Sequence, residues 1–492
     1  MSKSLAKTIK ILIVVLVTLT LWLMPSNSFG IEGLTVIQQR MIAIFAFAAL
    51  MWILEAVPAW VTSVLIIVLM LFTVSDSSIA FLIDPANYDP SQLVPTEKDP
   101  TKFQLTGLLT YKSIMASFAD PVVMLFMGGF VLALVASKSG VDVDMARVML
   151  KPFGTNPKVV LLGFMVVTAI FSMFISNTAT AAMMLTFLAP VFRTLPDSER
   201  GRVALALAIP IGCNIGGIGT PIGTPPNGIA LKYLKEAGFE IGFADWMVVM
   251  VPLMLAILLI SWLILTMMFR FKSDKLEFTI QGGAKKEWQT TAIYIVLVVT
   301  ILLWCLEKLV GINSYVTALF PVAAFAALGI INAKDLKEID WSVLWMVAGG
   351  FALGTGMDKS GLAKAMVDSI PFDTFPVFAV VIGAGLICWL LSTFISNSAS
   401  AALMVPILVT VGTGMKSQLE GIGGLTTLIA GLALSASFAM ALPISTPPNA
   451  IAYSTGLVET KQMAKVGLIV GVISLALGYG LLIVLGSANM LF

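Results

Sequence analysis

An eleven-residue pattern occurs twice in this chain, both times inside strongly apolar sequence. Residues 172–182 read SMFISNTATAA, and residues 392–402 read STFISNSASAA, 220 positions later. Three further matches keep nearly the same offset: 127–130 with 348–351, 137–140 with 358–361, and 224–227 with 446–449. Such an ordered set predicts an internal duplication, so any fold for this chain has to place each element twice.

The composition indicates that this duplicated fold lies in a lipid bilayer. Of the 492 residues, 58% are hydrophobic and 11% are charged, and mean hydropathy is +0.99. Soluble domains carry about 25% charged residues. Stretches of about 20 apolar residues are long enough to cross a bilayer as helices. We therefore predict an all-α polytopic membrane protein with spans near 11–27, 36–56, 59–76, 117–136, 246–270, 289–309, 314–332, 341–357 and 466–489.

Four other apolar segments are interrupted by polar residues or by glycine and proline. Segments 203–233 and 425–455 are predicted to be broken helices, which brings the expected number of transmembrane helices to 11. Segments 159–192 and 374–412 are predicted to be re-entrant helical hairpins that reverse at SNT and SNS. Charge alone does not separate such a hairpin from a full crossing pair.

The distribution of lysine and arginine predicts the orientation. Most of the 29 basic residues fall on one side if the N-terminus is cytoplasmic and the C-terminus is external. An odd number of crossings then separates the copies, which makes the duplication an inverted repeat, as in many secondary transporters. The expected organisation is an N-terminal helix (1–35), repeat 1 (36–270), a cytoplasmic linker (271–288) and repeat 2 (289–492). The polar segment 83–104 is expected to be a plain external loop.

The hairpin reversals have the chemistry of an ion site. Backbone at membrane depth is tolerated only where it is buried in protein or lines a wet cavity. The helix that starts after SNT or SNS presents free N–H groups and partial positive charge, which suit a carboxylate. The helix that ends before it presents free carbonyls, which suit a sodium ion.

The proline-rich breaks supply complementary groups. GIGTPIGTPPNGIA (217–230) and ALPISTPPNAIA (441–452) cannot continue a regular helix. A hairpin tip beside each break would give two cation cages that flank one anion site. Neither the hairpins nor these breaks contain lysine or arginine. We therefore expect co-transported cations to compensate the charge of the anion.

At these residues the chain resembles the divalent anion/sodium symporter family, which includes bacterial and animal dicarboxylate and citrate carriers. The likeness rests on the two hairpin motifs, GTPIGTPPN, STPPN and ADPVVMLFMGGF (119–130). It implies a homodimer in which each protomer has a scaffold domain and a transport domain that moves as an elevator. It also implies substrate contacts from Ser176, Asn177, Thr178, Ser396, Asn397, Ser398, Thr446 and Pro447.

The resemblance further implies two sodium sites, one in each repeat. The first would use Ser172, Ser176, Asn177 and Gly223, and the second Ser392, Ile395 through its carbonyl, Asn397 and Ser445. Ser398 departs from the threonine that many relatives have, which retains the hydroxyl but loses a methyl group. This leaves the identity of the preferred anion open.

The sequence thus predicts a secondary transporter of the cell membrane, which would be the inner membrane in a Gram-negative bacterium. The expected activity is sodium-coupled symport of C4-dicarboxylates such as succinate, malate or fumarate, without an organic cofactor or a nucleic-acid partner. Alternatives are sodium-independent dicarboxylate exchange, transport of citrate or sulfate, and an anion channel. An intramembrane hydrolase is disfavoured because the chain has no histidine and no GxSxG motif.

Overall fold

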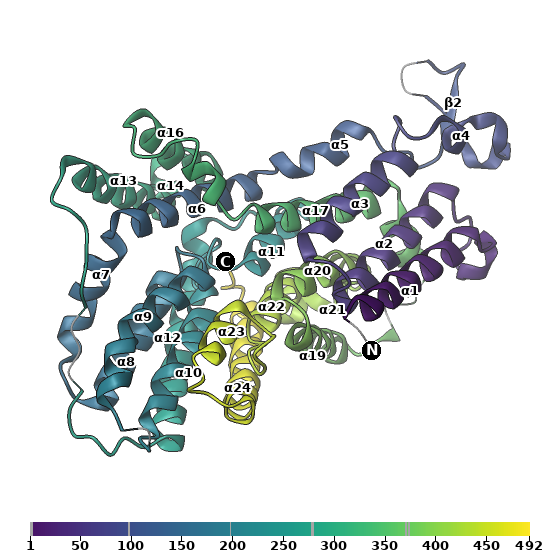
Figure 1. Ribbon diagram of the computed structural model, residues 1–492. Coiled ribbons are helices and arrows are strands. Elements are labelled where there is room, and N and C mark those ends of the chain that lie inside the picture. The colour runs from purple at the N-terminus through teal and green to yellow at the C-terminus, as the bar shows by residue number, and fades with distance from the viewer. Residues whose placement is uncertain (1–2, 97–98, 197, 277–279, 370, 372–373) are drawn as a thin grey trace.

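The structure is a computed structural model that describes residues 3–96, 99–196, 198–276, 280–369, 371 and 374–492. Its described residues are mainly helical, and the helices form an elongated molecule (Figure 1). The helices are α1 (Lys3–Leu23), α2 (Val36–Leu54), α3 (Ala59–Thr73), α4 (Ala80–Ile83), α5 (Tyr111–Met115), α6 (Pro121–Ser139), α7 (Val141–Leu150), α8 (Pro157–Ser172), α9 (Asn177–Thr194), α10 (Gly201–Gly217), α11 (Pro225–Glu236), α12 (Phe243–Met268), α13 (Trp288–Cys305), α14 (Glu307–Val310), α15 (Ser314–Thr317), α16 (Leu319–Ala327), α17 (Trp341–Lys359), α18 (Leu362–Ser369), α19 (Val377–Phe394), α20 (Asn397–Gly414), α21 (Lys416–Leu419), α22 (Gly424–Ser437), α23 (Pro447–Ser454) and α24 (Thr460–Ser487).

Each predicted span coincides with a helix or with a pair of helices. Among the described residues, 8 helices are long and apolar enough to cross a membrane, or up to 9 if a bent pair that includes α22 is one span. This count does not correspond one to one with the predicted 11, because it includes α19 and α20, the two limbs of the predicted hairpin 374–412. Several expected spans are absent from it because they are short or divided: α3 has 15 residues, and 314–332 splits into α15 and α16. The chain is a multi-pass membrane protein, and the 11-helix arrangement stays a prediction.

The segment predicted to be a plain loop contains a short two-stranded hairpin that the sequence did not indicate. Strands β1 (Leu93–Pro95) and β2 (Phe103–Leu105) pair antiparallel, with Leu93 opposite Leu105. The buried Arg40 of α2 fixes the preceding stretch, because its guanidinium donates to the Leu82 carbonyl at 2.9 Å and to the Tyr88 hydroxyl at 2.7 Å. Each strand has three residues, and β1 ends at Pro95, which cannot donate a backbone hydrogen bond.

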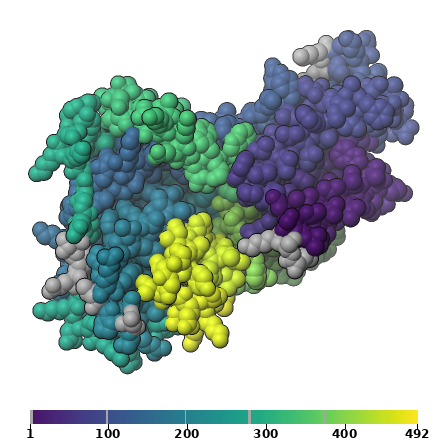
Figure 2. Space-filling model, viewed as in Figure 1, coloured from purple at the N-terminus to yellow at the C-terminus, as the bar shows by residue number. Residues whose placement is uncertain are grey.

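The two hairpins occupy matching places in the helix packing. Helices α8 and α9 both pack on α10, and their counterparts α19 and α20 both pack on α22. The second half of each broken helix crosses to the other copy: α23 packs on α9, and α11 packs on α20. The C-terminal helices α22 to α24 consequently lie between the α8–α12 group and the α1–α3 group (Figures 1 and 2). This exchange brings both hairpin tips and both breaks to one place.

Paired glycines let the flanking helices approach closely. A Cβ on Gly128 of α6 would lie 2.1 Å from the Ala318 carbonyl oxygen, and one on Gly349 of α17 would lie 2.3 Å from the Ser63 side chain. The following glycine of α17, Gly350, faces Ala402 of α20. Gly129 of α6 likewise faces the Ile222 side chain of the first break. The second glycine of each GGF motif therefore packs against the hairpin–break region, and the first packs against another part of the chain.

Candidate functional site

The two hairpin turns are built in the same way. Ser176 caps α9, and its hydroxyl accepts a hydrogen bond from the Ala179 N–H at 3.3 Å. Ser396 caps α20 and accepts from the Ala399 N–H at 3.2 Å. Each cap leaves other N–H groups of the first turn free, so each tip presents a partial positive charge.

A buried serine beneath each tip holds the asparagine that follows the turn. The Ser172 hydroxyl contacts Asn177 Oδ1 and donates to the Cys213 carbonyl at 2.9 Å. The Ser392 hydroxyl makes the equivalent contacts, at 2.8 Å to Asn397 Oδ1 and at 2.8 Å to the Ala436 carbonyl. Both serines are 0% exposed. The predicted sodium-site serines are therefore also the groups that orient the hairpin asparagines.

Each proline-rich break is closed by the asparagine of its Thr-Pro-Pro-Asn motif. Asn227 Nδ2 donates to the carbonyls of Gly217 at 2.9 Å and Thr220 at 2.8 Å. Asn449 Nδ2 donates to the carbonyl of Met440 at 2.8 Å and to that of Leu442 at 2.9 Å. These bonds satisfy carbonyls that the broken helix leaves without intrahelical partners, and they fix the shape of the break.

A hydroxyl from each break also holds the adjacent hairpin. Thr220 Oγ1 contacts the Met173 carbonyl, and Ser445 Oγ donates to the Thr393 carbonyl at 2.7 Å. Gly223 occupies the position of repeat 1 that matches Ser445. A Cβ there would lie 2.4 Å from the Gly217 carbonyl oxygen, so glycine is required for this close approach.

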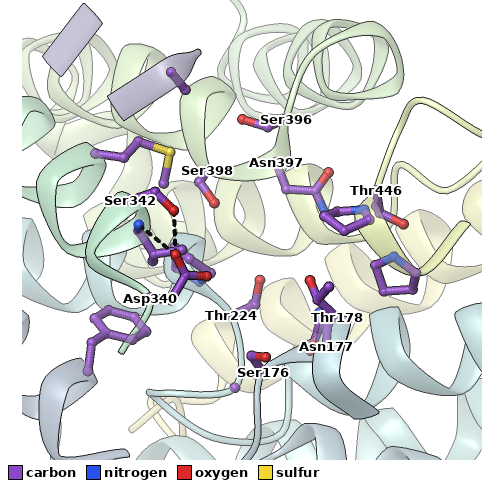
Figure 3. A pocket seen from close by; sticks show the side chains of 18 of the residues that line it. Ser176, Asn177, Thr178, Thr224, Asp340, Ser342, Ser396, Asn397, Ser398 and Thr446 are labelled. Atoms are coloured by element: carbon purple, nitrogen blue, oxygen red, sulfur yellow. Dashed lines mark hydrogen bonds between the residues drawn. The ribbon is translucent and has the colours of Figure 1, made fainter. Parts of the chain in front are cut away.

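The tips and breaks meet at one open cavity of about 300 Å³ (Figure 3). It is lined by all eight predicted substrate residues: Ser176, Asn177, Thr178, Ser396, Asn397, Ser398, Thr446 and Pro447. Of the remaining predicted sodium-site residues, Gly223 and Ser445 line it as well. Ser172, Ser392 and Ile395 are buried. The first residues of α9, α11, α20 and α23 all belong to the lining, so four helix N-termini converge on this space.

Four polar lining residues were not predicted from the sequence: Asn214, Thr224, Asp340 and Ser342. Thr224 has an obvious signal, because it matches Thr446 in the repeat. Asp340 and Ser342 come from the start of α17, where Asp340 caps the helix and accepts a hydrogen bond from the Ser342 hydroxyl. Asp120 is likewise the N-cap of α6 in repeat 1, but the offset of the GGF motifs places it opposite Trp341, so the repeat aligns the two caps only to within one residue.

Asn214 links the two repeats directly. Its Nδ2 donates to Thr446 Oγ1 at 3.3 Å and to Asn449 Oδ1 at 3.2 Å. The amide orientation is fixed because Asn449 Oδ1 can only accept. Asn214 Oδ1 is buried and has no hydrogen-bond partner among the described residues. A buried acceptor of this kind is costly unless a ligand, an ion or water satisfies it.

Comparisons with known proteins find relatives among membrane transporters. The family model described as "Citrate transporter" matches residues 49–423. The "Sodium-dependent dicarboxylate transporter SdcS" of Staphylococcus aureus is 30% identical over 474 residues, which cover 88% of this chain and 83% of SdcS. Both comparisons concern transporters and not enzymes.

Two solved structures share the fold. MtrF of Neisseria gonorrhoeae, described among antimetabolite efflux pumps, aligns with a TM-score of 0.54 at 15% identity and covers 87% of this chain and 94% of its own. The YdaH transporter of Alcanivorax borkumensis aligns with a TM-score of 0.52 at 14% identity, covering 80% and 92%. With the SdcS and citrate-transporter matches, the chain belongs to the divalent anion/sodium symporter family of membrane transporters.

Proposed function

We propose that this protein imports C4-dicarboxylates, such as succinate, malate or fumarate, by sodium-coupled symport. The observation that carries the proposal is the convergence of four helix N-termini on a cavity without lysine or arginine among its described lining residues. Helix N-termini attract carboxylates through their partial positive charge, and here free N–H groups come from α9 and α20. Helices α11 and α23 begin with Pro-Pro, so their first two residues supply no N–H group and these helices contribute the partial charge alone. The name of SdcS supports both the substrate class and the coupling ion.

Dianion and sodium occupy neighbouring parts of the site in this proposal. One carboxylate lies against the tip at Asn177 and the other against the tip at Asn397. Sodium ions lie behind the tips, held in the first site by Ser172, Ser176, Asn177 and Gly223 and in the second by Ser392, Ile395, Asn397 and Ser445. Hydroxyl, amide and carbonyl oxygens are the ligands that such a cation prefers. The cations offset the charge of the substrate. When the total charge of the cations exceeds the charge of the dianion, the membrane potential favours uptake.

Transport by an elevator movement belongs to the same proposal. The hairpins, the broken helices and the C-terminal helices would carry the site past a scaffold that includes α6 and α17, in each protomer of a homodimer. The N-terminus would be cytoplasmic and the C-terminus external. The two repeats would comprise residues 36–270 and 289–492. The exchange of α11 and α23 between the repeats supports a site that moves as one unit.

Uptake of labelled succinate into proteoliposomes tests the function. Sodium outside should drive concentrative uptake, and replacing sodium by choline should reduce it to the background of empty liposomes. Undiminished uptake in choline would exclude sodium coupling and favour exchange. Failure of unlabelled succinate, malate and fumarate to compete would exclude C4-dicarboxylates.

Citrate is the second candidate substrate because the matching family model is described as a citrate transporter. The same competition experiment separates the two substrates. Citrate competing at least tenfold more strongly than succinate would make a tricarboxylate the substrate of this cavity.

A further inference from the structure

Asp340 is the only charged residue among the described residues that line the cavity. It is exposed, and its carboxylate caps α17 by accepting from the Val343 N–H at 3.4 Å. The Ser342 hydroxyl also donates to it. In the view of Figure 3, Asp340 and Ser342 lie on one side of the cavity and Thr446 lies on the other. No lysine or arginine pairs with Asp340 among the ion pairs of the described residues.

A lone carboxylate is unexpected in a cavity that would bind an anion. Capping of α17 explains part of its role, because a negative group is favourable at a helix N-terminus. The helix offsets only about half of one charge, so a net negative charge stays at this wall. Asp120, the matching cap of α6, does not show this feature. It has Lys232 at 3.9 Å, and it does not belong to the cavity lining.

We propose that Asp340 is a selectivity residue that favours loading of sodium and opposes loading of the dianion without sodium. This inference rests on the proposed function. A cavity of this volume is about 8 Å across, and a unit charge at that distance changes the affinity for a unit charge by about 2- to 30-fold, depending on the local dielectric. A dicarboxylate has two negative charges, so Asp340 lowers its affinity by this factor once for each charge. For each sodium ion Asp340 raises the affinity by the same factor.

The consequence is a site that is rarely occupied by the anion alone. At a given concentration of substrate, Asp340 lowers the fraction of protein that holds the dianion without cations. It raises the fraction that holds sodium and awaits the anion. A symporter needs this distribution, because movement of the site with anion but without sodium would let accumulated anion leak back across the membrane uncoupled from the sodium gradient.

The test uses Asp340→Asn in the purified full-length protein in nanodiscs, with choline chloride used to hold ionic strength constant. Calorimetry measures the dissociation constant of sodium without organic anion, and that of succinate at a fixed low and a saturating sodium concentration. The variant should bind sodium at least about twofold more weakly and succinate at least about fourfold more tightly. Monomethyl succinate carries one charge, so its affinity should increase only by about the square root of the factor measured for succinate.

Opposite shifts for the two ligands distinguish electrostatics from damage to the fold. A structural defect would weaken both ligands. Asp340→Glu should return both constants towards the wild-type values because it restores the charge. Glu338→Gln removes an exposed carboxylate two positions away that is not part of the cavity lining, and it should change neither constant by more than about twofold.

Three results would overturn the role of Asp340: weaker binding of both ligands, tighter binding of both, or no change in either for Asp340→Asn. A wild-type protein that does not bind succinate in saturating sodium would instead refute the proposed substrate. The sodium measurement would then still test Asp340 alone. A wild-type protein that binds no sodium would refute the coupling and the role of Asp340 together.

Discussion

The two halves of the site share their backbone geometry but differ at the residue that precedes each Thr-Pro-Pro-Asn motif. Repeat 1 has Gly223, which touches the Gly217 carbonyl, and Thr220 holds the hairpin. Repeat 2 has Ser445, which itself holds the hairpin through the Thr393 carbonyl. The same task is therefore done by residues at non-matching positions. The breaks of the two copies have the same shape, but different residues support the hairpin tip in each copy.

The largest effects should come from the groups that the halves share. Asn177→Ala and Asn397→Ala each remove an amide that lines the cavity and is oriented by a buried serine. Loss of a hydrogen bond to a charged ligand costs about 1.5–3 kcal/mol, so succinate uptake should fall at least about tenfold in each variant. Initial rates in proteoliposomes at equal protein content provide the measurement.

If the two halves of the site are equivalent, succinate uptake should fall to a similar degree in both asparagine variants. Expression and elution as a single species by size exclusion serve as the control for folding. Wild-type uptake in one variant would remove that hairpin from the site and would break the equivalence of the two halves.

Exchanging the residue that differs should harm the two halves for different reasons. Gly223→Ser forces a Cβ to within 2.4 Å of the Gly217 carbonyl oxygen, so the break must shift and sodium affinity should fall about tenfold or more. Ser445→Gly removes a hydrogen bond of 2.7 Å without a clash. It should lower the free energy of unfolding by about 1 kcal/mol, and it should also weaken sodium binding because it removes a hydroxyl from the second proposed sodium site.

Sodium titrations monitored by thermal stability, together with the melting temperature without sodium, separate the two variants. Equal sodium affinity in Gly223→Ser and wild-type protein would show that the close contact at Gly223 does not shape a cation site.

A smaller difference is expected between the threonines of the two breaks. Thr446 caps α23 by accepting from the Asn449 N–H at 3.3 Å, and it also accepts from Asn214, whereas the Thr224 side chain makes no capping bond. Thr446→Val should cost about 1 kcal/mol of stability and raise the half-saturation concentration for succinate several-fold. Thr224→Val should raise half-saturation without a loss of stability. Uptake kinetics and melting curves measure both, and unchanged half-saturation in Thr224→Val would leave Thr224 without a ligand contact.

The smallest effect should come from an ion pair outside the site. Lys138 at the end of α6 pairs with Asp335 just before α17, and this contact lowers the pKa of the Asp335 carboxyl. A lowered pKa gives stability that is present above the pKa of the unfolded chain and is lost as pH falls through the pKa of the folded state. Lys138 is half exposed, so Lys138→Met should cost at most about 1 kcal/mol at pH 7.

Melting temperatures from pH 7 to pH 3 check this expectation. The gap between Lys138→Met and wild type should narrow as the pH falls, while succinate half-saturation stays unchanged. A gap independent of pH would mean that packing of the lysine stem, and not its charge, is what the variant loses.

The sequence was sufficient to predict the features that repeat locally. The serine and asparagine of each hairpin are five residues apart, so one turn of backbone brings them together, as for Ser172 and Asn177. All eight substrate positions that the family resemblance implied line one cavity, although it takes the exchange of α11 and α23 between the repeats to bring them together. The ends of the broken helices are also close to those expected, because glycine and proline interrupt a regular helix where they occur in the sequence.

The groups contributed by distant helices could not be predicted in this way. Asp340 and Ser342 reach the cavity because α17 packs against α20, where Gly350 faces Ala402. Asn214 is an ordinary position of α10 until α23 crosses from the other repeat to meet it. Their contributions depend on which helices are neighbours, and neither spacing nor composition encodes that.

The most direct test of the central claim is a cryo-EM structure in sodium and succinate, paired with one in choline. The account predicts succinate density between the side chains of Asn177 and Asn397, with smaller peaks behind each tip that disappear in choline. Tips that lie far apart and face lipid, or succinate density bound away from both asparagines, would contradict it.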